Sequence, residues 1–140
     1  MAKNIFNLKS TPAPEPEFKP DAYHIHIYFK PGEASEKNAV DVARAIDARF
    51  PGAVEDMHRV GKVGPHTEAN IGMTITPESF GAVLGWLQMN NKGLSILIHP
   101  RTGDELVDHG DAALWLGKPV PFNEKFFDQF RPQAPKGPSL

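Results

Sequence analysis

The sequence contains no cysteine among its 140 residues. Disulfide bonds, zinc–thiolate sites, iron–sulfur clusters and cysteine nucleophiles are therefore excluded. Any metal ion must be held by histidine and carboxylate side chains, a donor set that suits non-haem iron, zinc or manganese. The lack of disulfides also favours a cytoplasmic setting, which is the localisation that we expect.

The sequence also lacks an excess of basic residues, because 15 lysines and arginines stand against 17 acidic residues and the net charge is −2. Binding to phosphates needs a basic surface, so nucleic acid is not expected as a partner. No apolar run approaches the length of a membrane span, and the N-terminus has no signal-peptide core. The length suits one domain with a hydrophobic core of its own.

The most informative stretch is residues 23–29, Tyr-His-Ile-His-Ile-Tyr-Phe, in which two kinds of side chain alternate. Such alternation predicts a β-strand with an apolar core face and a second face that carries His24, His26 and Tyr28. The two imidazoles would lie roughly 6.5–7 Å apart along the strand, close enough to serve one metal ion. Two half-exposed histidines on an edge strand would give the same local pattern.

Hydrophobic periodicity and turn residues divide the rest of the chain into further elements. The predicted elements are, in order, a strand at 23–29, a helix at 33–50, strands at 54–60 and 66–75, a helix at 77–90 and a strand at 94–99. This order predicts an α+β, ferredoxin-like βαββαβ sandwich.

Three regions are predicted around this sandwich. Residues 1–20 contain four prolines and are expected to form a flexible arm. Residues 21–120 would form the domain, and residues 121–140 a Phe- and Pro-rich tail. The segment after residue 100 is too apolar to remain free, so we expect it to pack on the open sheet face or on a partner subunit, within a homodimer.

Five of the six histidines are expected to converge at one end of the sheet. The prediction assumes that the first and third strands lie side by side and parallel, with the fourth antiparallel along the other edge of the first. His24, His26 and His66 would then start their strands on one face, where His99 ends the fourth strand. His109 follows in the segment that leaves the same end. A hydrogen-bonded polar network without a metal is the alternative interpretation.

Carboxylates could complete such a site. Glu68 shares the polar face with His66, while Asp104 and Asp108 follow the last strand. Two histidines and one carboxylate would be typical of iron(II) oxygenases, but an all-histidine site remains equally open at this point. His58 lies on an edge strand, and we interpret it as an ordinary surface histidine.

Several separated motifs carry a resemblance to a known family. The motifs are His24-Ile-His26-Ile-Tyr28-Phe29, Gly64-Pro65-His66, Ile98-His99-Pro100 with Thr102-Gly103-Asp104, Asp108-His109, and Trp115-Leu116-Gly117. Across about residues 22–120 the chain resembles the DOPA 4,5-dioxygenase family. The resemblance implies an oxidoreductase that cleaves the ring of a DOPA-like catechol with O₂, in the extradiol manner, at a non-haem Fe(II).

The resemblance also implies roles for particular residues. All five converging histidines carry over to the active site. We assign the metal, Fe(II) or another divalent ion such as zinc, to His24, His26 and His99, and proton transfer to His66 and His109. Glu68 is not part of the family pattern, so it and Asp108 remain only alternative carboxylate ligands.

Tyr28 and Arg101 are the predicted substrate-binding residues, the arginine as counter-charge for a carboxylate on the catechol. Three other functions compete with the dioxygenase. A metal-free small-molecule binder or cofactor-independent monooxygenase of the dimeric ferredoxin-like kind would use the same sheet face. A zinc hydrolase would use the same ligands. An RNA-binding module shares the strand order, but it would need sheet aromatics beside basic residues.

Overall fold

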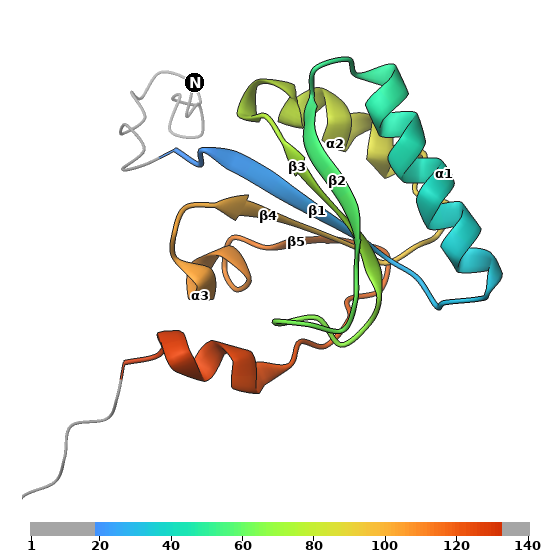
Figure 1. Cartoon of the computed structure of the whole chain (residues 1–140). Helices are drawn as coiled ribbons and strands as arrows, with labels where there is room; N and C mark the ends of the chain where they lie inside the picture. The colour runs from blue at the N-terminus through green and yellow to red at the C-terminus, as the bar shows by residue number, and fades with distance from the viewer. Residues whose placement is uncertain (1–18, 133–140) are drawn as a thin grey trace, which may run out of the picture.

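The computed structural model describes residues 19–132 (Figure 1). Most of the predicted N-terminal arm and the last eight residues of the predicted tail, 133–140, lie outside the described residues. The elements, in which η marks a 3₁₀ helix, are β1 (Ala22–Tyr28), α1 (Ala34–Arg49), β2 (Val54–Val60), β3 (Asn70–Ile75), η3 (Pro77–Ser79), α2 (Phe80–Met89), β4 (Ile96–Arg101), α3 (Glu105–Asp108), β5 (Leu114–Leu116) and η4 (Glu124–Phe130). None of the helices in this range is long and apolar enough to cross a membrane.

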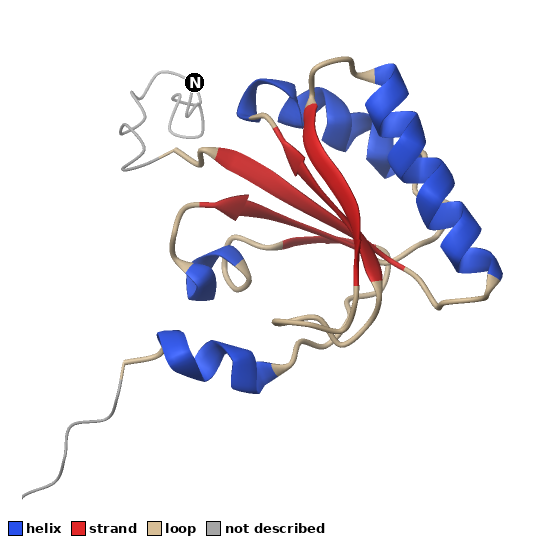
Figure 2. Ribbon diagram, viewed as in Figure 1, coloured by secondary structure: helices blue, strands red, loops and turns tan. Residues whose placement is uncertain are grey.

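The five strands form one antiparallel sheet in the order β2-β3-β1-β4-β5, which places β1 at the centre. Figure 2 shows α1 and α2 on one face of the sheet, and α3 and η4 on the other. The predicted α+β, ferredoxin-like arrangement is confirmed, with β5 as an additional strand beside β4. The C-terminal segment packs on the face that the two long helices leave open, which is one of the two placements that the sequence predicted.

One predicted strand relationship is wrong, because β1 and β3 run antiparallel rather than parallel. Helix α1 returns the chain so that β1 and β2 point the same way, and the β2–β3 hairpin then places β3 between them in the opposite direction. The start of β3 therefore lies beside the end of β1, where Asn70 pairs with Tyr28. His66, just before β3, reaches the site from this end and not from beside His24.

The alternation predicted for β1 is present in the structure. Ile25 and Ile27 are buried in the core that α1 and α2 cover, and Tyr23 stacks on Phe80 with ring centroids 3.7 Å apart. Most other core residues come from one stripe of each helix and from alternate positions of β3 and β4: Ala39, Val42, Ala43, Ile46, Ile71, Met73, Ile75, Val83, Leu87, Ile96 and Ile98. Each buried aliphatic side chain contributes roughly 1.5–3 kcal/mol, so this core holds the histidine face of β1 in place.

Element boundaries differ from the prediction in the segments that shape the site. Residues 66–69 form a loop instead of the start of β3, because Gly64 adopts a left-handed φ of 60° and Pro65 follows it, which turns the chain away from the sheet. Strand β4 continues two residues beyond His99. Strand β5, Leu114–Leu116, was not predicted, since three residues are too few to show a period.

Candidate metal centre

Three histidines from the two central strands point their ring nitrogens at one another. His24 and His26 lie two residues apart on β1, and His99 lies directly opposite His24 on β4. One ring nitrogen of each residue lies within 4.8 Å of the others, and His26 and His99 are buried. The sheet therefore brings together the three predicted metal ligands.

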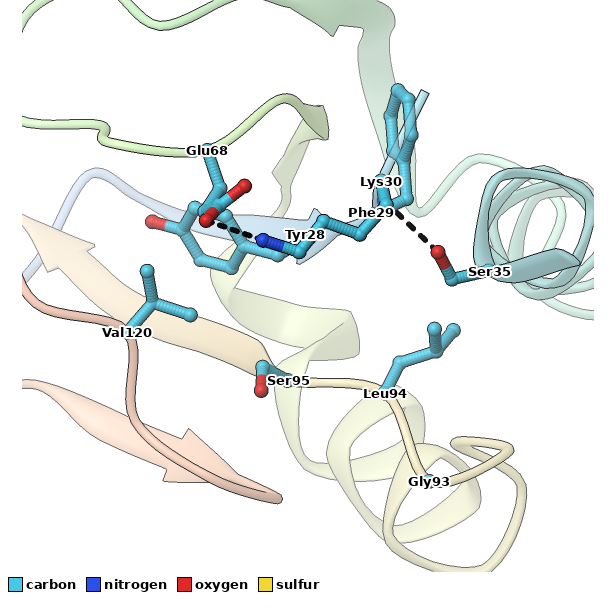
Figure 3. A pocket seen from close by; sticks show the side chains of 9 residues that line it. All are labelled: Tyr28, Phe29, Lys30, Ser35, Glu68, Gly93, Leu94, Ser95 and Val120. Carbon is cyan, nitrogen blue, oxygen red and sulfur yellow. Dashed lines mark hydrogen bonds and ion pairs between the residues drawn. The ribbon is translucent and has the colours of Figure 1, made fainter. Parts of the chain in front are cut away.

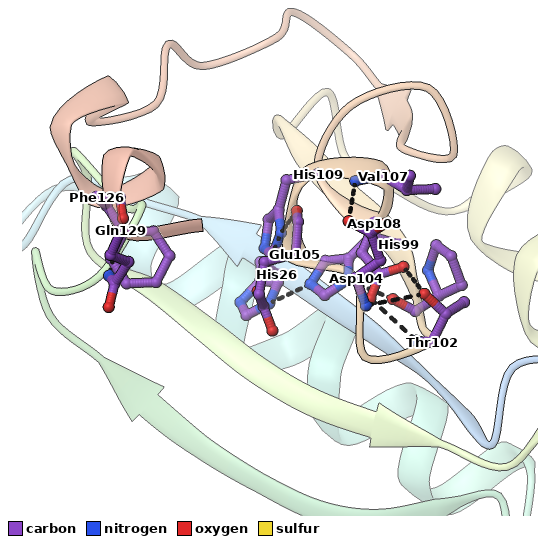
Figure 4. A network of polar contacts seen from close by, with 11 residues as sticks. His26, His99, Thr102, Asp104, Glu105, Val107, Asp108, His109, Phe126 and Gln129 are labelled. Atoms are coloured by element: carbon purple, nitrogen blue, oxygen red, sulfur yellow. Dashed lines mark hydrogen bonds and ion pairs between the residues drawn. The ribbon is translucent and has the colours of Figure 1, made fainter. Parts of the chain in front are cut away.

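The closest approach in this group joins two nitrogens of the same type. His99 Nε2 lies 3.3 Å from His26 Nε2 (Figure 4). On the far side of each ring, His26 Nδ1 lies 3.0 Å from Asn70 Oδ1, and His99 Nδ1 lies 2.8 Å from the Pro100 carbonyl oxygen. Oxygens of this kind only accept hydrogen bonds, so each Nδ1 carries the proton. In the neutral rings, both Nε2 atoms then present lone pairs to each other.

Two facing lone pairs repel each other unless a hydrogen-bond donor or a cation lies between or beside them. A proton is disfavoured, because burial and the neighbouring charge of His66 hold the pKa of His26 well below its usual value. Burial, with the charge of His109, likewise lowers the pKa of His99 to about 3. Two imidazoles on one zinc-like ion at bond lengths of about 2.05 Å have nitrogens about 3.3 Å apart. The donor set therefore fits a divalent transition metal.

His66 and His109 extend the cluster on either side. The His66 ring lies 4.4 Å from that of His26 between centroids, and its Nδ1 lies 2.8 Å from the Tyr28 hydroxyl oxygen. The His109 ring lies 4.2 Å from that of His99. His109 Nδ1 donates to the Glu105 carbonyl oxygen at 3.0 Å, which leaves Nε2 as an acceptor. Burial, ahead of the charge of His109, lowers the pKa of His66 to about 4.

The position of His109 depends on a short capped helix. Asp104 accepts a hydrogen bond from the Val107 backbone N–H at 3.1 Å and so caps α3, which His109 ends. Asp108 is buried, and its carboxylate accepts from the Thr102 backbone N–H at 3.0 Å and from the Thr102 hydroxyl at 2.6 Å. Both carboxylates therefore shape the turn that presents His109, and the structure places neither in the three-histidine group (Figure 4).

Glu68, the other carboxylate considered, lies in the loop before β3 and forms an ion pair with Lys30 at 2.6 Å. This pair borders a cavity of about 250 Å³ that Tyr28 also lines and that the three histidines do not (Figure 3). Among the described residues, the group able to hold a metal contains histidines and no carboxylate. An all-histidine site is thus the arrangement that the structure offers.

Glycine makes room for His26. Gly72 of β3 lies opposite His26, and a Cβ there would lie 3.5 Å from His26 Nδ1 and 3.1 Å from Val60 Cγ2. His58 is on the other side of Gly72, on edge strand β2, and is exposed. It lies outside the three-histidine group, in agreement with its interpretation as a surface histidine.

Aromatic rings wall the space beside the histidines. Between ring centroids, Tyr28 stacks on Trp115 at 5.8 Å and Trp115 lies 5.8 Å from Phe122. The Phe122 ring meets the His109 ring edge-on, with centroids 5.6 Å apart. Burial raises the pKa of Tyr28, so its hydroxyl keeps its proton at neutral pH. The wall suits a flat, partly apolar ligand.

The segment that carries Phe122 is tied to the loop that carries His66. Asn123 donates its backbone N–H to the Pro65 carbonyl oxygen at 2.9 Å, and the Thr67 hydroxyl donates to the Pro121 carbonyl oxygen at 2.7 Å. The two segments, residues 65–67 and 121–123, thus cover the histidine face of the sheet, and together they are called the roof.

Arg101, predicted to bind substrate, lies at the end of β4 and forms an ion pair with Asp21 at 2.7 Å. The pKa of His24 is lowered, first by burial and second by the positive charge of Arg101. Sequence reasoning did not give Asn70 and Trp115 roles in the site. Asn70 carried a usable signal, since a buried amide on the polar face of a predicted strand must find a partner.

Comparison with known proteins agrees with this geometry. A model of the Dopa 4,5-dioxygenase family matches residues 23–126. The chain belongs to this family. The resemblance inferred from the histidine motifs is therefore confirmed, and all five clustered histidines fall within the matched range.

Three proteins similar to this chain illustrate the match. DOPA 4,5-dioxygenase of Amanita muscaria is 33% identical over 107 residues, or 72% of this chain and 47% of that protein. An uncharacterized 21.2 kDa protein of Botryotinia fuckeliana is 31% identical over 121 residues, or 80% of this chain and 66% of that protein. The crystal structure of a candidate dioxygenase from Nostoc punctiforme is 35% identical with a TM-score of 0.71, covering 80% of this chain and 95% of that one. The chain thus spans less than two thirds of the length of either fungal relative.

Proposed function

We propose that this protein is a cytoplasmic extradiol dioxygenase that cleaves a catechol with O₂ at a non-haem iron(II). The proposed ligands are His24, His26 and His99. The observation that carries the proposal is the 3.3 Å approach of two Nε2 atoms whose rings are already committed at Nδ1. Membership of the Dopa 4,5-dioxygenase family and the aromatic wall beside the site support the choice of reaction.

The reaction needs no reductant beyond the substrate. One carbon–carbon bond beside the diol breaks, both atoms of O₂ enter the product, and the ring carbons supply the four electrons. When bound, iron(II) would supply Lewis-acid and template chemistry, with coordination positions that the three histidines leave open. An all-histidine set also allows zinc, which leaves a zinc hydrolase to be tested by activity.

His66 and His109 are the proposed proton-transfer residues. Both rings lie against ligand rings without belonging to the three-histidine group, and the Nδ1 proton of His109 is committed to a backbone carbonyl. The Nε2 atom of His109 can thus accept a proton from the catechol and return that proton after ring opening. His66 can exchange a proton with the Tyr28 hydroxyl across 2.8 Å.

The substrate would lie between the histidine face and the roof. Tyr28, Trp115 and Phe122 would contact the flat ring. Arg101 is the proposed counter-charge for an acidic substituent, which would have to compete with Asp21 for the guanidinium group.

The test is anaerobic loading with iron(II), followed by a panel of catechols with O₂ uptake and product absorbance recorded together. We expect one O₂ consumed per catechol by wild type and none by His26→Ala or His99→Ala, each folded by circular dichroism. His58→Ala is the matched control and should retain wild-type turnover, since His58 lies outside the histidine group.

The outcomes separate the alternatives. Iron-loaded wild type that consumes no O₂ with any catechol would contradict the dioxygenase. A protein that binds no iron, zinc or manganese in calorimetric titrations at pH 7.5 would be a metal-free binder or a cofactor-independent enzyme instead.

A further inference from the structure

We propose that Asn70 is a positioning residue that holds His26 in its Nδ1–H form and so keeps the His26 Nε2 lone pair available to a metal. The part of this inference that concerns metal affinity rests on the proposed function. The part that concerns the tautomer of His26 is a property of the metal-free protein and stands separately.

The orientation of the Asn70 amide follows from its two partners. Asn70 is fully buried at the start of β3, and its Nδ2 donates to the Glu68 backbone carbonyl at 3.3 Å. That contact requires the NH₂ group on the Glu68 side and the Oδ1 atom on the side of His26. Since Oδ1 is 3.0 Å from His26 Nδ1 and cannot donate, the ring nitrogen must donate.

Other rings in the cluster are oriented by the backbone. His99 Nδ1 faces the Pro100 carbonyl and His109 Nδ1 faces the Glu105 carbonyl, and no substitution removes these acceptors. His26 differs, because its acceptor is a side chain 44 residues away. Asn70 is therefore a place where one mutation can change the tautomer of a candidate ligand without changing the ligand itself.

Loss of the Asn70 acceptor would favour a hydrogen bond between His26 and His99 that makes both Nε2 atoms unavailable to a metal. A protonated His26 Nδ1 without Asn70 would be a buried donor with no partner, which costs about 1–3 kcal/mol. Moving that proton to Nε2 avoids the cost, because His26 Nε2–H could donate to His99 Nε2 at 3.3 Å. This hydrogen bond would occupy both ligand atoms at once. Asn70 thus opposes the neutral arrangement in which His26 donates to His99, as the Pro100 carbonyl opposes the reverse one.

The experiment uses the full chain, with imidazole ¹⁵N–¹H correlation spectra of the metal-free protein and zinc titration by calorimetry at pH 7.5. We expect the Nδ1–H form of His26 in wild type and a shift toward the Nε2–H form in Asn70→Leu. Zinc should bind Asn70→Leu about 10–100-fold more weakly than wild type, the usual cost of losing an outer partner of a metal ligand. Asn70→Asp keeps an acceptor toward His26 and should retain the Nδ1–H tautomer, although its second oxygen replaces the NH₂ group that donates to the Glu68 carbonyl.

The matched control is Thr74→Val. Thr74 is buried on the same face of β3, but its hydroxyl donates to Asp56 at 2.9 Å rather than to a histidine. It should leave the His26 tautomer and zinc affinity unchanged, whereas equal losses in Thr74→Val and Asn70→Leu would reduce the effect to general destabilisation and overturn the proposal.

Two further outcomes are decisive. The Nε2–H form of His26 in wild type overturns the proposal even if Asn70→Leu fails to fold. If wild type binds no zinc or iron(II) while His26 is in the Nδ1–H form and shifts in Asn70→Leu, the role of Asn70 stands and the metal site of the proposed function fails.

Discussion

Acid should destabilise the metal-free protein through its buried histidines, and His99 allows the size of the effect to be worked out. Burial and the nearby charge of His109 lower the pKa of His99 from 6.5 to about 3. The unfolded chain takes up a proton on this imidazole as the pH falls through 6.5, whereas the folded protein does so only near pH 3. The contribution of His99 to stability is therefore fully present above pH 6.5 and is lost as the pH falls below it.

Each pH unit in this window costs about 1.36 kcal/mol for one such histidine. Between pH 6.5 and 5 the free energy of unfolding should thus fall by about 2 kcal/mol through His99 alone. His26, whose pKa burial also lowers, adds a loss of the same sign. Because a domain of this kind is stable by only about 5–15 kcal/mol, a loss of this size is readily measured.

The assay is urea unfolding of chelator-treated protein at several pH values between 7.5 and 5, for wild type and His99→Gln. The difference between the two pH dependences isolates His99, since most other groups titrate alike in both proteins. The variant should lose about 2 kcal/mol less than wild type across the window. His58→Gln is the control and should follow wild type, because exposed His58 lies outside the buried histidine group. Identical pH dependences for wild type and His99→Gln would refute the reasoning.

Other expected outcomes concern turnover, folding and assembly. His66→Ala and His109→Ala should each bind iron(II) but lower O₂ uptake by about 10²–10⁴-fold, the usual effect of losing a proton-transfer group; wild-type rates in both would exclude that role. Asp108→Ala should lower the free energy of unfolding in urea by about 3 kcal/mol, because both Thr102 donors lose a buried carboxylate. Light scattering at micromolar concentration should give the mass of a homodimer, and a monomeric mass would contradict the predicted assembly.

The sequence was sufficient to predict the histidine face of β1 and its approach to β4. Once Ile25 and Ile27 are assigned to the core, the period of a strand places His24 and His26 together on the opposite face. The ferredoxin-like strand order then puts His99 on the neighbouring strand. These inferences needed only the period of each strand and the order of the strands, and both are visible in the pattern of apolar residues.

The remaining parts of the site depend on features without a period. His66 lies in a loop, whereas the prediction placed it at the start of a strand that ran in the wrong direction. The prediction therefore put His66 beside the wrong residues. Trp115 lies in a three-residue strand and Phe122 in irregular chain. In such segments hydrophobic patterning does not predict which way a side chain points. Glu68 was considered as a ligand because of its face in the predicted strand, whereas the loop turns it toward Lys30.

The separation of the proposed ligands along the chain has a consequence for how the protein matures. His26 and His99 are 73 residues apart, and the roof residue Phe122 follows later still. A growing chain that has emerged only through β3 carries His24 and His26 on one strand, which are two of the three proposed ligands. Contacts between distant residues form late, after the loops that join them have closed. We therefore expect metal loading to follow folding of the sheet rather than to guide it, so that a cell short of metal would accumulate a folded, empty protein and not an unfolded one.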